Sequence, residues 1–229
     1  MNQQNQLYCA WSGPLLMVLF GLGFWVFAQY MPPHSPAMSA EGIAAIFQNN
    51  ANMIRIGQVF LIAAAALAVP FAAAITMQMI RIEGRQPVLA YAQLGSGILG
   101  AVFLLLPGLL WSAAAFRPER AVEITQFVND LSWIILLFTF SPAFVQLVCI
   151  GLAILGDKGK ATVFPRWSGY VNLWVAVTFL PAALIPFFKS GPFAWDGLFG
   201  FWIPAGAFFA WLALMSVLLV QAIKQQKPE

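Results

Sequence analysis

The sequence predicts an all-α fold: a polytopic membrane protein whose single transmembrane domain (residues 1–229) is a six-transmembrane-helix bundle, with a short interfacial helix after the first span. Hydrophobic residues make up 61% of the chain and charged residues 8%, whereas about a quarter of the residues in soluble domains are charged. The chain also contains six apolar stretches of the roughly 20 residues that cross a bilayer as a helix. These runs do not alternate as the strands of a membrane barrel do, and helices satisfy their own backbone groups in lipid.

The first span is expected at about 10–31. It does not look like a cleavable signal peptide, because the preceding segment MNQQNQLYCAW carries no basic side chain and the apolar run is too long. Gly21 and Gly23 provide a small surface on which a neighbouring helix can approach closely.

The segment that follows the first span contains Pro32, Pro33 and Pro36, which prevent a helix from continuing. Ser39 can cap a short helix over about residues 40–48. Its apolar residues share one face at helical spacing: Ile43, Ile46 and Phe47. A short helix of this kind is expected to lie along the outer membrane interface.

The second and third spans are expected at about 54–80 and 89–115, joined by RIEGRQP. The third contains Gly95, Gly97 and Gly100, which again favour close helix packing. Prolines lie within or near several spans, where each can kink its helix: Pro70, Pro107, Pro142, Pro181, Pro186 and Pro204.

The remaining spans are expected at about 124–155, 167–188 and 198–223. The connections between spans are short, and no phosphate-binding loop occurs in the sequence. Direct use of ATP by this chain alone is therefore disfavoured.

The basic residues predict the orientation. With both termini in the cytoplasm, seven basic residues lie inside: Arg81, Arg85, Lys158, Lys160, Arg166, Lys224 and Lys227. Four lie outside: Arg55, Arg117, Arg120 and Lys189. The positive-inside rule favours this arrangement in the cell (cytoplasmic) membrane. Because the basic residues do not cluster and the net charge is only +3, nucleic acid is not an expected partner.

The stretch RPERAVEITQFVNDLSW, residues 117–133, concentrates charge before a long apolar run. Helical spacing places Glu123, Gln126 and Asp130 on one stripe, with Trp133 following. Residues 131–155 span a bilayer without Asp130, at 1.5 Å per residue. Arg55 stands just before its own span in the same way, so both charges are expected at the outer boundary rather than in a proton relay at mid-membrane.

These charges belong to a predicted polar belt at the outer end of the bundle: Arg55, Arg117, Glu119, Arg120, Glu123, Asn129 and Asp130. We expect Asp130 to pair with Arg55 or Arg117, since pairing lowers the penalty of burying either charge. The belt is interpreted as a network that locks helices together, as the floor or gate of a pocket open to the outer leaflet, or as a source of catalytic carboxylates. The sequence leaves all three open.

The fifth span and the turn into the sixth are rich in aromatic residues. Interfacial aromatic belts explain much of this pattern, and an aromatic-lined entrance for a lipophilic molecule is the alternative. Trp195 is expected in the compact turn KSGPFAWDG, and Asn172 is expected to bond across to another helix.

Neither a metal nor a cofactor is expected. His34 is the single histidine, so b-haem and histidine-cluster metal sites are disfavoured. Cys9 and Cys149 lie in different spans without metal or redox spacing.

The sequence favours a protein that binds or passes a hydrophobic small molecule, alone or as the membrane subunit of a complex. Its candidate ligand-binding residues are Arg55, Arg117, Glu123, Asn129, Asp130, Trp133, Asn172 and Trp195. The expected partners are membrane lipid, a lipophilic small molecule, and a membrane protein or second copy of the chain packed on the glycine faces.

The alternative is a membrane-embedded enzyme of the isomerase or proton-transfer type acting on a lipid or sterol-like substrate. Asp130 or Glu123 would then be the acid/base, and Asn129 or Trp133 would position the substrate. A purely structural subunit is a third interpretation. The sequence leans away from an enzyme.

Overall fold

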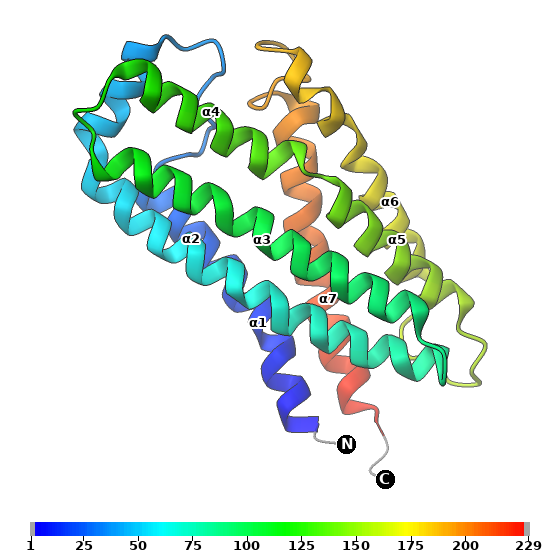
Figure 1. Cartoon of the computed structure of the whole chain (residues 1–229). Coiled ribbons are helices and arrows are strands. Elements are labelled where there is room, and N and C mark those ends of the chain that lie inside the picture. Colours follow the sequence, from blue (N-terminus) through cyan, green and yellow to red (C-terminus); the bar gives the residue numbers. More distant parts are fainter. Residues whose placement is uncertain (1–2, 227–229) are drawn as a thin grey trace.

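The computed structural model describes residues 3–226, and within this range the chain is helical and contains no strand (Figure 1). Six helices are long and apolar enough to cross a membrane, as the sequence predicts: Gln3–Phe27, Ala40–Glu83, Val88–Phe116, Val122–Gly156, Arg166–Phe187 and Leu198–Lys224. The first of these helices begins before the expected span. It also ends earlier than expected, because the chain leaves the helix after Phe27. Lys227, which the orientation argument counts, lies outside the described residues.

The six helices are built from ten elements. These are α1 (Gln3–Gly21), η1 (Leu22–Phe27), α2 (Ala40–Glu83), α3 (Val88–Phe116), α4 (Val122–Phe138), α5 (Ser141–Gly156), α6 (Arg166–Thr178), η2 (Leu180–Phe187), η3 (Leu198–Trp202) and α7 (Ile203–Lys224). The segments η1 and η3 are π-helical, and η2 is a 3₁₀ helix.

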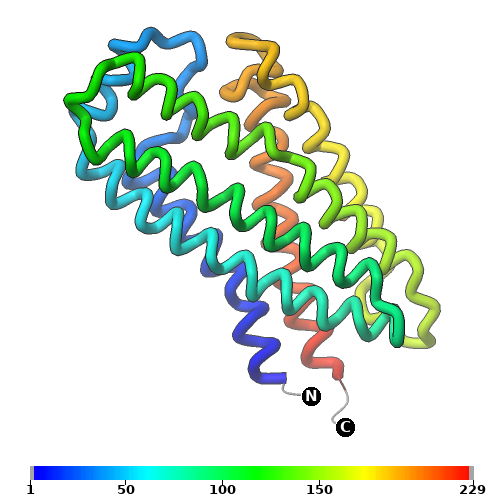
Figure 2. Tube along the Cα trace, in the orientation of Figure 1, coloured from blue at the N-terminus to red at the C-terminus, as the bar shows by residue number. Residues whose placement is uncertain are grey.

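Both ends of the described chain lie at the same end of the bundle, which we call the proximal end (Figure 2). Residues 28–39, 117–121 and 188–197 make the connections at the opposite, distal end (Figure 1). α2 and α3 run side by side and form the most extensive helix pair.

The predicted short helix after the first span is present at the start of α2. Asn50 (φ −120°, ψ 18°) is non-helical, and the kink at this residue separates residues 40–49 from the rest of α2. The Ser39 hydroxyl accepts a hydrogen bond from the Gly42 N–H at 3.2 Å, so the predicted cap is confirmed. Ile43 and Phe47 are buried in the distal core, so this apolar face packs against the protein itself.

Two side chains of α2 complete the ends of α3. The Glu83 carboxylate accepts hydrogen bonds from the N–H groups of Leu89 (3.0 Å) and Ala90 (2.8 Å) at the start of the helix. At its end, the Arg55 guanidinium donates to the Ala115 carbonyl at 3.0 and 2.7 Å. Helix termini leave such backbone groups without partners, and each charge has the sign that suits the helix dipole. α2 therefore fixes α3 at both ends.

Glycines allow close contact where the first and third helices meet their neighbours. A Cβ added to Gly23 would lie 2.6 Å from the Gly57 carbonyl oxygen, and one added to Gly97 would lie 2.8 Å from the Ala72 Cβ. Close packing is therefore confirmed at these two predicted positions. A Cβ would meet open space at the others: Gly21, Gly95 and Gly100.

A buried polar network ties the proximal ends of three helices. The Gln6 Oε1 accepts from the side-chain amides of Gln78 (2.7 Å) and Gln226 (2.9 Å). Arg81 donates to the Gln78 Oε1 and to the Ala222 carbonyl. The first, second and sixth spans are thereby linked where both termini emerge.

Besides the kink of α2 at Asn50, four of the six long helices are interrupted or change their helical type. The first passes into η1, the fourth breaks at residues 139–140 just before Pro142, the fifth tightens into η2 at Pro181, and the sixth begins as η3 before Pro204. Pro142 lacks the N–H that would continue the hydrogen-bond ladder. Pro70 and Pro107, in contrast, lie inside continuous α2 and α3.

Candidate functional site

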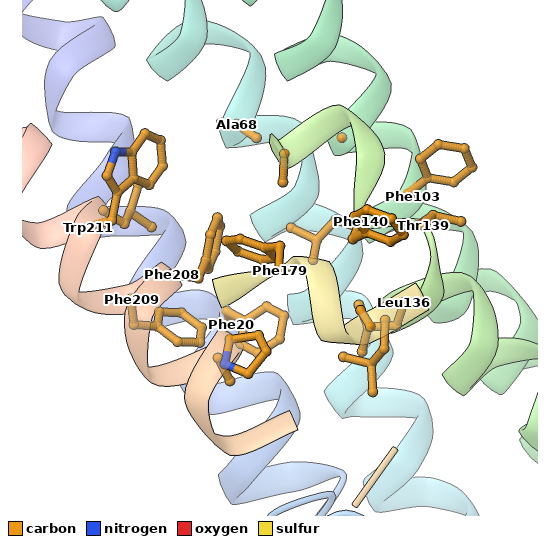
Figure 3. Close-up of a pocket in the computed structure, with 18 of the residues that line it drawn as sticks. Phe20, Ala68, Phe103, Leu136, Thr139, Phe140, Phe179, Phe208, Phe209 and Trp211 are labelled. Atoms are coloured by element: carbon orange, nitrogen blue, oxygen red, sulfur yellow. The ribbon is translucent and has the colours of Figure 1, made fainter. Parts of the chain in front are cut away.

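A cavity of about 180 Å³ lies inside the bundle and is lined by residues from all six long helices. In the view of Figure 3, Phe20, Phe208 and Phe209 lie to one side of it, and Leu136 and Phe140 lie to the other. The site is thus assembled from residues far apart in the sequence.

The interruptions of the four helices meet at this cavity. Phe24 of η1, Thr139 and Phe140 at the break between α4 and α5, Ala182 of η2 and Phe201 of η3 all line it. Non-helical backbone at membrane depth is tolerated where it is buried in protein or lines a cavity, and π-helical turns are frequent at functional sites. The helices are therefore irregular where they surround the cavity.

The cavity wall is almost entirely apolar. Its polar side chains are Thr139 and Gln146. The Thr139 hydroxyl donates to the Ile135 carbonyl of its own helix at 2.5 Å, while the Gln146 amide lies against Gly97. Apolar pockets with few polar groups are the usual environment of small lipophilic ligands.

Asn172 supports one wall of the cavity from behind. Its Oδ1 accepts a hydrogen bond from the Nε1 of Trp211 at 2.8 Å, and its Nδ2 donates to the Ser168 carbonyl at 2.8 Å. Trp211 itself lines the cavity. The prediction that Asn172 bonds across to another helix is confirmed, since it joins α6 to α7.

An aromatic cluster fills the bundle between the cavity and the distal connections. We call it the distal aromatic cluster: Phe24, Tyr30, Trp111, Trp133, Trp195 and Phe201. Trp133 is its centre, with ring-centroid distances of 5.2 Å to Trp111, 5.8 Å to Tyr30 and 6.4 Å to Trp195.

Hydrogen bonds tie this cluster to the distal chain segments. The Trp111 Nε1 donates to the Asn129 Oδ1 at 3.3 Å, and the Trp195 Nε1 donates to the His34 carbonyl at 2.7 Å. Burial raises the pKa of Tyr30 and lowers that of His34. Both side chains are therefore neutral near pH 7.

The structure brings together three of the eight predicted site residues, Asn129, Trp133 and Trp195, around the distal aromatic cluster. Arg117 and Glu123 are exposed, and the Arg117 guanidinium lies 6.0 Å from the Phe116 ring centroid. None of the eight predicted residues lines the cavity: Arg55, Arg117, Glu123, Asn129, Asp130, Trp133, Asn172 and Trp195.

The expected ion pair between Asp130 and an arginine is not formed in the described part of the chain. Arg55 instead donates to the carbonyls at the end of α3 and to the Asn52 Oδ1 at 2.9 Å. The cation that interacts with Asp130 is Lys189. The end of α3 offers Arg55 carbonyl acceptors without helical partners, and the guanidinium is used to bind them.

The buried face of α4 carries neutral polar residues rather than carboxylates: Thr125, Asn129 and Ser132, followed by Trp133. Glu123 is exposed and Asp130 is partly buried. The charges of residues 117–133 therefore mark the distal turn and the start of α4, and the neutral side chains point into the bundle.

The cavity-lining phenylalanines are the residues that sequence reasoning missed. Each span contributes only a few of them, among many similar residues that pack elsewhere. The one local signal is the proline that follows an interruption, as Pro142 follows residues 139–140 and Pro204 follows η3.

Comparison of the chain with family models, with curated proteins and with solved structures finds no match. Among residues 3–226, no group of three or more His, Cys, Asp or Glu side chains is arranged to hold a metal ion.

Proposed function

We propose that this chain is a multi-pass integral membrane protein that binds a hydrophobic small molecule in the central cavity, to hold it or pass it on, alone or as the membrane subunit of a complex. The observation that carries the proposal is the meeting of four irregular helices at one apolar cavity. Discontinuous membrane helices at the level of a cavity are the usual construction of a transporter binding site.

The size of the cavity supports an occupant. Its volume of about 180 Å³ is comparable to that of engineered apolar cavities of about 150 Å³, which stay dry and take up apolar molecules. The cavity is only partly enclosed by the helices, and a lipophile that fills it would gain packing contacts with the apolar wall.

The membrane setting rests on the six long apolar helices and the orientation on the distribution of basic residues. We place the chain in the cell membrane, with both termini on the cytoplasmic side and the distal aromatic cluster toward the outer leaflet. Residues 40–48 would then lie near the outer interface. A membrane partner or second copy would pack on the open glycine of the first span, Gly21.

The enzymatic alternative has less support. Asp130 and Glu123, the two candidate acid/base residues, do not line the cavity. A lipophile held there would not touch either carboxylate, so proton transfer to it has no donor in reach.

Photolabelling with the apolar diazirine 3-trifluoromethyl-3-phenyldiazirine tests the proposal in proteoliposomes. A cavity site predicts saturable labelling of residues such as Phe140 and Phe208, which excess unreactive analogue removes. Side chains on the outer surface such as Trp174, which is 73% exposed, should be labelled without saturation. Labelling that is nowhere saturable would contradict the proposal.

A matched pair of variants on α3 makes the test specific. Gly100 lines the cavity and Gly95 does not, while a Cβ at either meets open space. Gly100→Leu should remove the saturable labelling because it fills the cavity, and Gly95→Leu should leave it unchanged.

A further inference from the structure

Six residues at the distal end have a buried polar side-chain atom without a hydrogen-bond partner: Tyr30, His34, Gln58, Thr125, Asn129 and Trp133. His34 is only partly buried, and Asn129 already accepts a hydrogen bond from Trp111 through its Oδ1. The other four contribute the hydroxyls of Tyr30 and Thr125, both amide atoms of Gln58 and the indole Nε1 of Trp133. Each of these residues is at most 1% exposed. Native structures rarely leave buried polar groups unpaired, and such groups are unfavourable in an apolar surrounding. We call these four residues the buried polar set.

The set is gathered in one place. Tyr30 and Trp133 are both rings of the distal aromatic cluster, 5.8 Å apart. Thr125 lies one turn before Asn129 on the buried face of α4, and Asn129 accepts from the cluster residue Trp111.

Gln58 reaches the same region from α2. It shares a helix face with Ile54 and Leu61, both of which belong to the distal core that contains Tyr30, Trp111 and Trp133. Its Oε1 lies 3.8 Å from the position that a Cβ on Gly108 would take, one turn before Trp111. Residues from α2, α4 and the 28–39 connection thus converge.

The chemistry of the set favours a neutral partner. Together the four residues offer N–H and O–H donors and an amide carbonyl acceptor, and none of them carries a charge. A carbonyl or hydroxyl group could be satisfied by such donors and acceptors, whereas an ion would lack a counter-charge within the set.

The set also borders the central cavity. Phe24 and Phe201 line the cavity, and each contacts Trp133, with ring-centroid distances of 5.7 and 6.3 Å. Both rings stand on π-helical segments, η1 and η3. They form the wall between the apolar cavity and the polar side chains.

We propose that the buried polar set recognises the polar end of the cavity's occupant, which is therefore an uncharged lipophile with a carbonyl or hydroxyl group at one end. The apolar body occupies the cavity, and the polar end meets Trp133 and Tyr30, which both contact the Phe24 ring, when the Phe24 and Phe201 rings turn aside. This inference rests on the proposed function, since it requires a ligand in the cavity.

The test compares the binding of two compact probes with the same carbon skeleton, adamantane and 2-adamantanone. Binding is measured to the protein in lipid nanodiscs, and the partition of each probe into empty nanodiscs is subtracted. Two conservative variants remove hydrogen-bonding groups of the set, Tyr30→Phe and Trp133→Phe. Ser132→Ala is the matched control, because the Ser132 hydroxyl is buried on the same helix but donates to the Val128 carbonyl.

The inference predicts that wild type binds 2-adamantanone about fivefold more tightly than adamantane, the ratio that one neutral hydrogen bond supplies. Tyr30→Phe or Trp133→Phe should remove this preference without weakening adamantane binding, and Ser132→Ala should retain it. Equal binding of both probes in wild type would overturn the inference and leave the cavity site intact. Binding of neither probe would overturn the cavity site as well.

Discussion

Phe24 and Phe201 stack with ring centroids 6.3 Å apart and an interplanar angle of 15°, although one belongs to the first long helix and the other to the sixth. Each lies in a π-helical segment, and both line the central cavity. The stacked pair therefore links the first and sixth long helices at the point where the cavity meets the distal aromatic cluster.

Phe24→Ala should destabilise the protein by about 3–5 kcal/mol, the usual loss for a buried phenylalanine. Its ring is 1% exposed and contacts Phe201 and four further aromatic rings. Unfolding in mixed detergent micelles measures the change. Phe116→Ala is the control, since Phe116 is 67% exposed and should change stability by no more than about 0.5 kcal/mol.

Asn172→Leu should destabilise the bundle by about 1–3 kcal/mol, because it leaves the buried Trp211 Nε1 without an acceptor. In the Asn172→Leu background, Trp211→Phe should lower the unfolding free energy by less than it does in wild type, because it removes the N–H that Asn172→Leu leaves without an acceptor. A double-mutant cycle on unfolding free energies measures this coupling. Strict additivity would show that the bond between α6 and α7 contributes nothing.

Arg55→Gln and Asp130→Asn should be additive in stability to within about 0.5 kcal/mol, because the two residues do not pair. Arg55→Gln alone should be destabilising, since it weakens the cap at the Ala115 carbonyl. A coupling free energy well above that limit would contradict this, and would indicate that Arg55 and Asp130 form the ion pair that the sequence predicts.

Stability should fall as the pH is lowered from 7 to 5, in part through His34. Burial lowers the pKa of His34 in the folded state below the ordinary value of about 6.5. The unfolded chain therefore takes up a proton first, and the stabilisation that is complete above pH 6.5 is lost as the pH falls toward the folded-state pKa.

His34→Gln isolates this contribution. Melting temperatures measured across the same pH range should depend less steeply on pH in the variant than in wild type. An unchanged slope would show that His34 is accessible to protons in the folded protein.

Composition and run length predict the six helices, because any apolar segment of this length in lipid must satisfy its backbone internally. Asn172 was predictable too, since an amide inside a span needs a partner on another helix. The hydrogen-bond partner of Arg55 could not be predicted, because the acceptors are backbone carbonyls at the end of α3, which any sequence would supply. The position of Asp130 at the outer membrane boundary stays a prediction, and the interaction of Asp130 with Lys189 depends on how the fifth helix ends.

The cavity could not be derived from the sequence. Its wall combines a few residues from each of six helices, and the departures from α-helix that shape it depend on packing as well as on proline. The sequence predicts Trp133 as a site residue because it follows a charged stripe, yet Trp133 lies on the neutral face that includes Thr125 and Asn129. A rotation of roughly 100° per residue separates the two stripes, and only packing selects the one that is buried.

The most direct test of the central claim is mass spectrometry of small molecules that co-purify with the protein in mild detergent. Wild type and Gly95→Leu should retain the same uncharged lipophile, and Gly100→Leu, with its cavity filled, should lose it. Retention of one compound by all three proteins, or of none by wild type, would contradict a ligand site in the central cavity.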